Sequence, residues 1–360
     1  MKLHTYILKS AYHALQDQRP DGSMPQGCNG PWNKPDTPVR TTAHWAMTFM
    51  HAFEMSQNDV FLQALKQSGK YLLSNPARPT GDFFVCRSQK GSKDTSNGLI
   101  GQAWAIQPLI RMGQEYQMSE CLDVALEVLR NHPYDEKRHG WHNMDVGGED
   151  RGHSWTINQQ VWFAAMVQQI STLDDGLQDR FNDFIDYFPR TVQTVEPGLI
   201  MHRQTPENQS NPSRSWKKWF YRHREDQRLR ELSDGYLSFI LYAFSMIERH
   251  AQHGSLLHRT GYTALLKEML LYGTERLGAN QVAGNRYAWS YNPVGIELAI
   301  AIQEFPSLAP ADANQDLWVR EQFSRHALDN PPLMCKNTPD PITLSARIYE
   351  AAPLTDCEIA

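Results

Sequence analysis

Residues 97–110 read NGLIGQAWAIQPLI, and residues 156–170 read TINQQVWFAAMVQQI. Each stretch begins with small polar residues and continues as almost uninterrupted apolar sequence that is too long for an ordinary strand. A helix that is apolar nearly all round must be buried on all sides. Similar stretches start near residues 42, 233, 293 and 343, so the six starts are spaced 50 to 77 residues apart. The chain therefore contains a weak sixfold repeat of a buried helix.

A second kind of helix precedes each buried one, at residues 3–17, 58–74, 117–131, 177–190, 257–277 and 314–327. In the third of these, Leu122, Ala125, Leu126 and Leu129 show the i, i+3, i+4, i+7 spacing of a helix with one buried face. Six one-sided helices alternating with six buried ones predict two concentric rings, that is, an all-α (α/α)6 toroid. No linker divides the chain, so we expect one domain over residues 1–360.

The loops carry further expectations. Residues 83–86 and 199–202 could form short strands. One connection, at about residues 204–231, is too long for a plain turn and is therefore expected to be functional or mobile.

Composition and charge exclude several classes of protein. The net charge of −5 gives no reason to expect a nucleic-acid partner. No apolar run reaches the length of a membrane span, and no signal core opens the chain, so a cytoplasmic location is expected. The five scattered cysteines suit reduced thiols. Nucleotide-binding and metal-binding spacings are missing, so neither a cofactor nor a metal is expected.

In such a toroid, the loops that enter the inner helices meet at one rim. Residues near these entries are rich in types that bind sugars, because flat aromatic rings pack on pyranose faces while Asn, Arg and carboxylates bind hydroxyls. Any one of the aromatic residues could instead merely pack helices together. The expected substrate-binding residues are Arg40, Trp45, Asn97, Gln102, Trp104, Trp141, His142, Trp155, Asn158, Arg203, Asp234, Tyr236, Arg286, Trp289 and Tyr291.

Asp94 and Asp150 form the candidate acid/base pair. Each precedes an inner helix by a few residues, in KDTSNG and EDRGHSW. Two carboxylates in different environments can cleave a glycosidic bond, since one protonates the leaving oxygen while the other activates water or attacks. Repulsion from Asp145 and Glu149 could raise the pKa of one of them. Either aspartate could instead cap its helix.

His44 and His153 are the alternative catalytic candidates. Histidine moves protons at neutral pH, as the epimerisation of a sugar requires. Each could equally be a hydrogen-bonded structural histidine.

Residues 214–230 read RSWKKWFYRHREDQRLR and carry a net charge of +5 with four aromatic residues between the charges. This basic-aromatic segment could cover the cavity and hold an anionic or lipid-linked sugar. It could instead contact an anionic membrane surface or a protein of an assembly complex.

Two longer motifs indicate a family. Residues 21–49 (DGSMPQGCNGPWNKPDTPVRTTAHWAMTF) and 94–109 (DTSNGLIGQAWAIQPL) resemble the VpsJ/AglQ-type proteins of bacterial exopolysaccharide gene clusters. The layout is also similar to that of unsaturated glucuronyl hydrolases and N-acylglucosamine epimerases.

The resemblance to the glucuronyl hydrolases implies that Asp94 and Asp150 stand where that family has its essential aspartates. Epimerases would need histidines at the helix entries, but Asp234 and Asn292 stand in the later repeats. The exopolysaccharide resemblance implies a role in making or trimming a surface polysaccharide. The carboxylate pair, the aromatic residues and Arg40, Arg203 and Arg286 predict a glycoside hydrolase-like enzyme that acts on an anionic oligosaccharide. The alternatives are a sugar epimerase and a non-catalytic sugar-binding protein of the assembly machinery.

Overall fold

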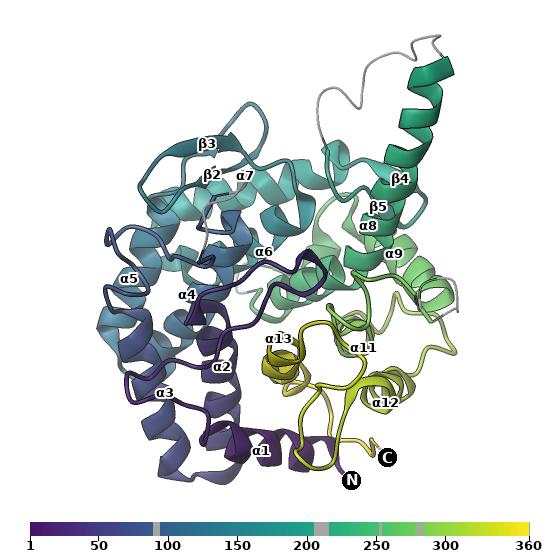
Figure 1. Ribbon diagram of the computed structural model, residues 1–360. Coiled ribbons are helices and arrows are strands. Elements are labelled where there is room, and N and C mark those ends of the chain that lie inside the picture. Colours follow the sequence, from purple (N-terminus) through teal and green to yellow (C-terminus); the bar gives the residue numbers. More distant parts are fainter. Residues whose placement is uncertain (89–93, 205–215, 252–253, 279–281, 283, 360) are drawn as a thin grey trace.

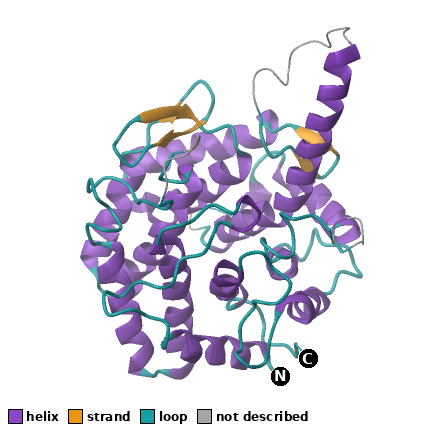
Figure 2. Cartoon of the chain, in the orientation of Figure 1, coloured by secondary structure: helices purple, strands orange, loops and turns teal. Residues whose placement is uncertain are grey.

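A computed structural model of the chain describes residues 1–88, 94–204, 216–251, 254–278, 282 and 284–359, with residues 216–226 described by their backbone only. Helices dominate, and the few strands lie in loops above the helices (Figure 2). Within the described ranges, no helix combines the length and the apolarity that crossing a membrane requires.

The inner ring consists of α2 (Pro38–Ser56), α4 (Gly98–Glu115), α6 (Ile157–Ile170), α8 (Trp216–Arg249), α11 (Val294–Glu304) and α13 (Pro341–Ala346), which η5 (Arg347–Ala351) continues. Each helix packs against the next in this order, and α13 and η5 pack against α2, so the ring closes (Figure 1). In α4 every residue from Gly98 to Ile110 is buried. This burial explains why the inner helices are apolar nearly all round.

The outer helices are α1 (Leu3–Ala14), α3 (Asp59–Leu72), α5 (Ser119–Arg130), α7 (Asp175–Thr191), α9 (Tyr262–Arg276) and α12 (Gln315–His326). They bury one face each, as in α5, where Ala125, Val128 and Leu129 are buried. The two ends of the chain meet, because Leu3 N donates to Cys357 O at 2.9 Å. The predicted (α/α)6 toroid is thus confirmed.

Some helix starts differ from their predicted positions. Helix α2 begins four residues before Thr42, where the Thr37 side chain accepts a hydrogen bond from Val39 N and Pro38 suits the first turn. The last inner helix begins at Pro341, and Asp340 accepts from Thr343 N at 3.1 Å. In both helices the capping residue lies upstream of the predicted start. Proline is accepted in the first turn of a helix, so each helix can begin at its proline.

The largest difference concerns α8, which the sequence placed from Ser233. The helix begins at Trp216, and its first turns project beyond the ring (Figure 1). The prediction of one long connection over residues 204–231 is wrong for its second half. Lys, Arg, Glu, Gln and Leu favour helix, and neither Gly nor Pro interrupts residues 216–234. Residues 205–215, and the side chains of the basic-aromatic segment up to residue 226, lie outside the described residues.

The strands form two small sheets. One joins β1 (Tyr134–Asp135), β2 (Gly140–Met144) and β3 (Asp150–His153), and the other joins β4 (Thr194–Glu196) and β5 (Leu199–Ile200). The strand predicted at 199–202 is therefore present in part. The strand predicted at 83–86 does not form, because the Gln102 side chain bonds both N–H and C=O of Phe84.

Candidate functional site

A cavity of about 820 Å³ opens where α4, α6 and α11 begin. Its aromatic lining residues are Trp32, Trp104, Tyr236, Phe239 and Tyr291. Its amide lining residues are Asn29, Asn97, Asn143, Asn158, Gln159 and Asn292. The charged groups of the described lining are Arg87, Arg203, Arg228 and Asp94, beside His202. Flat rings surrounded by amides and cations suit a polar ring-shaped ligand that carries negative charge.

Seven of the predicted site residues line this cavity: Asp94, Asn97, Trp104, Asn158, Arg203, Tyr236 and Tyr291. They come from the second to fifth repeats, so the toroid gathers residues that are far apart in sequence. The lining residues stand at helix entries, which is the end of the ring where the sequence predicts the site.

Asp94 lies one turn before α4 and both caps this helix and faces the cavity. Its Oδ1 accepts hydrogen bonds from Ser96 Oγ at 2.7 Å and from Gly98 N at 2.9 Å. No described residue bonds its Oδ2, and the side chain is only partly buried. One carboxylate oxygen is therefore available to a ligand while the other holds the helix start.

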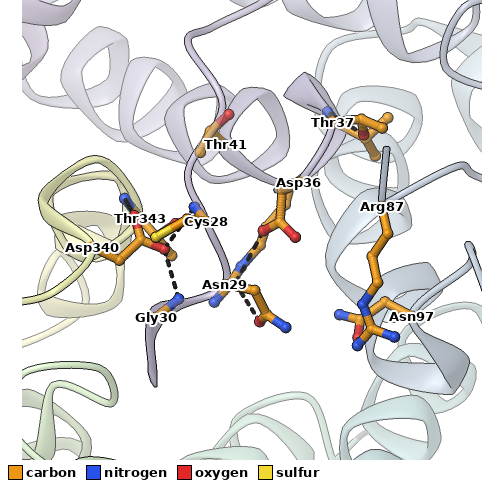
Figure 3. Close-up of polar contacts among 12 residues, drawn as sticks. Cys28, Asn29, Gly30, Asp36, Thr37, Thr41, Arg87, Asn97, Asp340 and Thr343 are labelled. Carbon is orange, nitrogen blue, oxygen red and sulfur yellow. Dashed lines mark hydrogen bonds and ion pairs between the residues drawn. The ribbon is translucent and has the colours of Figure 1, made fainter. Parts of the chain in front are cut away.

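Arg87 and Asn97 form the adjacent wall (Figure 3). Arg87 Nη2 donates to Asn97 Oδ1, and its Nη1 lies 3.4 Å from Asp94 O. The Arg87 side chain is nearly buried, so its charge is fixed beside the only carboxylate of the described lining.

The floor of the cavity rests on Arg40, which is 1% exposed and lies behind the lining residue Asn29. Arg40 Nη1 lies 3.2 Å from Asn29 Oδ1 and 3.5 Å from Asp36 Oδ2. Figure 3 shows Asp36 and Asn29 directed toward the same space. Burial raises the pKa of Asp36 to about 6, although the positive charge of Arg40 opposes this rise. Tyr291 belongs to the same hydrogen-bonded group, because its hydroxyl donates to Asn29 Oδ1 at 3.0 Å.

Several buried polar atoms below the cavity have no hydrogen-bond partner in the described part of the chain. They include Arg40 Nε and Nη2, both ring nitrogens of His44, and Trp104 Nε1. His44 is fully buried between Trp104 and Tyr349, with ring centroids 5.5 and 5.3 Å away. Burial and the charges of Arg40 and Arg347 lower the pKa of His44 well below its usual value. His44 therefore carries no charge at neutral pH.

Arg347 supports the opposite side of the floor. It pairs with the buried carboxylates of Glu297 and Glu350, and its Nη1 donates to Tyr291 O at 3.0 Å and Asn292 Oδ1 at 2.8 Å. All three charged side chains are fully buried. A buried charge is tolerated only when paired, so this group fixes two lining residues rigidly.

Asp150 does not line the cavity. It lies on β3, where its carboxylate is 2.8 Å from His142 Nδ1 and accepts from Gly152 N at 2.7 Å. Burial raises the pKa of Asp150, but these hydrogen bonds outweigh it and lower the pKa below its usual value. The structure thus places the two predicted aspartates in different surroundings and does not bring Asp150 to the cavity wall.

Other predicted residues also lie away from the cavity. Trp141 packs on Phe163 and Phe184, and the Trp289 indole N–H donates to Leu277 O. Twelve predicted residues are absent from the described lining of the cavity: Arg40, His44, Trp45, Gln102, Trp141, His142, Asp150, His153, Trp155, Asp234, Arg286 and Trp289.

The reasons are local. Asp234 accepts a hydrogen bond from the Tyr272 hydroxyl at 2.8 Å. The Gln102 side-chain amide donates to the backbone carbonyls of Phe84 and Ser96. Arg286 is exposed, and its Nε lies 3.7 Å from Glu231 Oε1. Trp45 belongs to the core. His153 and Trp155 line a second pocket.

The sequence did not single out Asn29, Arg87, Asn143, Gln159 and His202, which also line the cavity, as does Arg228 of the basic-aromatic segment. His202 is the chemically important omission. Its ring centroid lies 4.5 Å from that of Tyr236, and its backbone N–H donates to Ser233 Oγ at 3.0 Å. Its position next to Arg203 in the loop before α8 could have drawn attention to it.

Throughout the ranges that the structure describes, no three His, Cys, Asp or Glu side chains converge in a way that could hold a metal ion. The arrangement can nevertheless bind a ring-shaped polar ligand and exchange protons with it through Asp94 and His202.

No protein-family model matches the chain. It is 35% identical to archaeal glycosylation protein Q of Haloferax volcanii, over 99% of this chain and 98% of that one. Among solved structures it is similar to D-mannose isomerase (TM-score 0.61, 14% identity, 97% of this chain and 96% of that one). It is also similar to an unsaturated glucuronyl hydrolase specific for heparin (TM-score 0.56, 10% identity, 97% and 94%). At such low identity these two likenesses show the fold alone.

Proposed function

The chain belongs to the family of archaeal glycosylation protein Q, and from this premise we propose that it is a carbohydrate-processing enzyme whose glycan substrate occupies the central cavity. One observation carries the proposal. Five aromatic rings, six amide side chains and three arginines surround the single carboxylate of the described lining. Aromatic faces and amides bind sugars, and a lone carboxylate among them suits proton transfer.

The substrate is an anionic oligosaccharide. Arg87, Arg203 and Arg228 outnumber Asp94 among the described lining residues. A guanidinium pairs with a carboxylate, phosphate or sulfate through two parallel hydrogen bonds, which a neutral hydroxyl cannot provide. A charged sugar would offset this excess of positive charge. Such a substrate fits a role in assembling or trimming a surface glycan.

The reaction is hydrolysis of a glycosidic bond, with Asp94 and His202 as the proton-transfer groups in place of Asp94 and Asp150. Asp94 accepts a proton from water, the water oxygen bonds to the anomeric carbon, and the bond to the leaving oxygen breaks. His202 donates a proton to that oxygen. Imidazole suits this role because it is a common general acid and base in enzymes.

Epimerisation is the second candidate, and His202 at the cavity wall favours it. Here one group removes a proton from the carbon next to the carbonyl of the open-chain sugar, and the other returns a proton to the opposite face of that carbon. His44 could take part only as a neutral group, because its pKa is lowered well below the usual value.

Isotopes distinguish the two reactions. The protein is incubated with neutral and uronate-containing oligosaccharides in heavy-oxygen water and, separately, in D2O. Hydrolysis puts the water oxygen on a new reducing end, whereas epimerisation puts deuterium on a ring carbon without a new end. Mass spectrometry reads both. Binding of acidic oligosaccharides with neither label would indicate the non-catalytic sugar-binding protein instead, and failure to bind any of them would contradict the proposal.

A further inference from the structure

A second pocket, of about 290 Å³, lies behind one wall of the central cavity. We call it the outer pocket. Two short extended segments form the wall: Thr156 bridges to Arg203, Ile157 N donates to His202 O at 3.0 Å, and Gln204 N donates to Trp155 O at 2.9 Å. Successive side chains of an extended segment point to opposite faces. Thr156 and Arg203 accordingly line the central cavity, while Trp155, Ile157 and Gln204 line the outer pocket.

The floor of the outer pocket is apolar. Phe184 and Phe188 of α7 are each 3% exposed, and Ile157 and Val192 flank them. Phe184 is held from behind by Trp141, with ring centroids 5.2 Å apart. These side chains offer an apolar chain a surface on which it can pack away from water.

The entrance is cationic. Lys137 and Arg138 are exposed at the rim, and no carboxylate belongs to the described lining. Arg138 is held in place by Asp135, with 2.5 Å between Nη1 and Oδ2, and its guanidinium lies 5.7 Å from the Trp155 ring. The Lys137 ammonium has no ion-pair or hydrogen-bond partner among the described residues.

His153 adds an unsatisfied polar group. Its ring packs edge-on against Trp155 at 4.7 Å, and its Nδ1 is buried without a hydrogen-bond partner in the part of the chain that the structure describes. Buried nitrogen atoms normally find a partner. Both residues stand in the motif HSW that the sequence marked as a site, yet neither faces the central cavity.

We propose that the outer pocket binds an apolar chain that ends in a phosphate group. The chain would lie on Phe184 and Phe188, and the phosphate would lie between Lys137 and Arg138. Both the cationic entrance and the apolar floor are needed for binding. Exposed cations alone contribute little binding free energy, and a small apolar floor alone would not select an anion. The site is distinct from the central cavity, so the proposal does not depend on the reaction there.

Isothermal titration of the full chain with hexyl phosphate tests the proposal, with inorganic phosphate and hexanol as the two halves of the ligand. Hexyl phosphate should bind more tightly than either half. Lys137→Glu reverses an exposed charge at the rim. Gln193→Glu adds a negative charge to the lining with almost no change in shape, and its side-chain amide makes no hydrogen bond with the described residues. Lys137→Glu should weaken binding about fivefold, as loss of one favourable exposed pair implies. Gln193→Glu should weaken it by a similar factor, because the added carboxylate repels the phosphate.

Lys66→Glu is the matched control for Lys137→Glu. Lys66 is exposed on α3, outside the outer pocket, and both substitutions lower the net charge by two. It should leave the affinity unchanged. Equal affinities in all three variants, equally tight binding of inorganic phosphate, or no binding of hexyl phosphate at millimolar concentration would each overturn the proposal. Circular dichroism of each variant checks that the protein is folded.

Discussion

The guanidinium of Arg40 lies 4.1 Å from the ring centroid of Trp104, and both side chains are almost completely buried. Trp104 lines the central cavity, and Arg40 supports it from behind. A buried cation over an indole face gains more than an exposed one, because water does not compete with the ring. The contact therefore couples the stability of the inner ring to the shape of the cavity.

Arg40→Ala should destabilise the protein by about 3 kcal/mol, because it leaves the buried Asp36 carboxylate without its cation. Urea denaturation at neutral pH measures this loss. Adding Asp36→Asn to Arg40→Ala should restore part of the stability, since the unpaired charge is then removed. A double variant no more stable than Arg40→Ala would contradict this account of the pair.

Asp36 should also make stability depend on pH. Burial raises its pKa from 3.8 to about 6, so the folded protein binds a proton that the unfolded chain has already lost. The stabilising contribution is therefore complete below pH 3.8 and is lost as the pH rises through 6. The unfolding free energy of the wild type relative to Asp36→Asn should fall by about 2 kcal/mol between pH 4 and pH 7. Denaturation curves of both proteins at several pH values give this difference, and a constant difference would refute it.

Asp94→Asn should reduce turnover at least about a hundredfold, the usual range for losing an acid/base group. The Asn side-chain oxygen can still accept from Gly98 N, so α4 should keep its start. Asp150→Asn is the matched control and should leave turnover nearly unchanged, because Asp150 pairs with His142 away from the cavity wall. Rates of sugar release by both variants test the assignment. A large loss in Asp150→Asn with a normal rate in Asp94→Asn would reverse it.

Two tryptophans should behave differently although both stand near helix entries. Trp32 is partly exposed and lines the cavity, so Trp32→Ala should weaken oligosaccharide binding with a small change in stability. Trp141 is fully buried, so Trp141→Ala should cost about 3–5 kcal/mol. Calorimetric titration and urea denaturation of both variants provide the comparison. A loss of affinity confined to Trp141→Ala would show that the cavity is misassigned.

The sequence by itself determined the two rings. The long apolar stretches at residues 97–110 and 156–170 fit only helices that are buried on both sides. The one-sided helices between them form the outer ring that buries the outer face of these helices. It also predicted the end of the ring at which the cavity opens, because polar and aromatic residues gather where the inner helices begin. Asp94, Asn97 and Trp104 could be named on this basis.

Only the tertiary structure decided which of these residues share the cavity. Trp155 and Thr156 are neighbours in sequence, yet they face the outer pocket and the central cavity respectively, because the segment is extended. The hairpin that pairs β3 with β2 directs Asp150 away from the cavity. The sequence pattern did not predict this pairing of strands. His202 and Arg87 are held at the site by backbone pairing between repeats, because Ile157 N donates to His202 O and Asp36 bridges to Arg87. Helical periodicity is a local property and is written in the sequence, whereas the direction of a loop side chain depends on contacts with residues far along the chain.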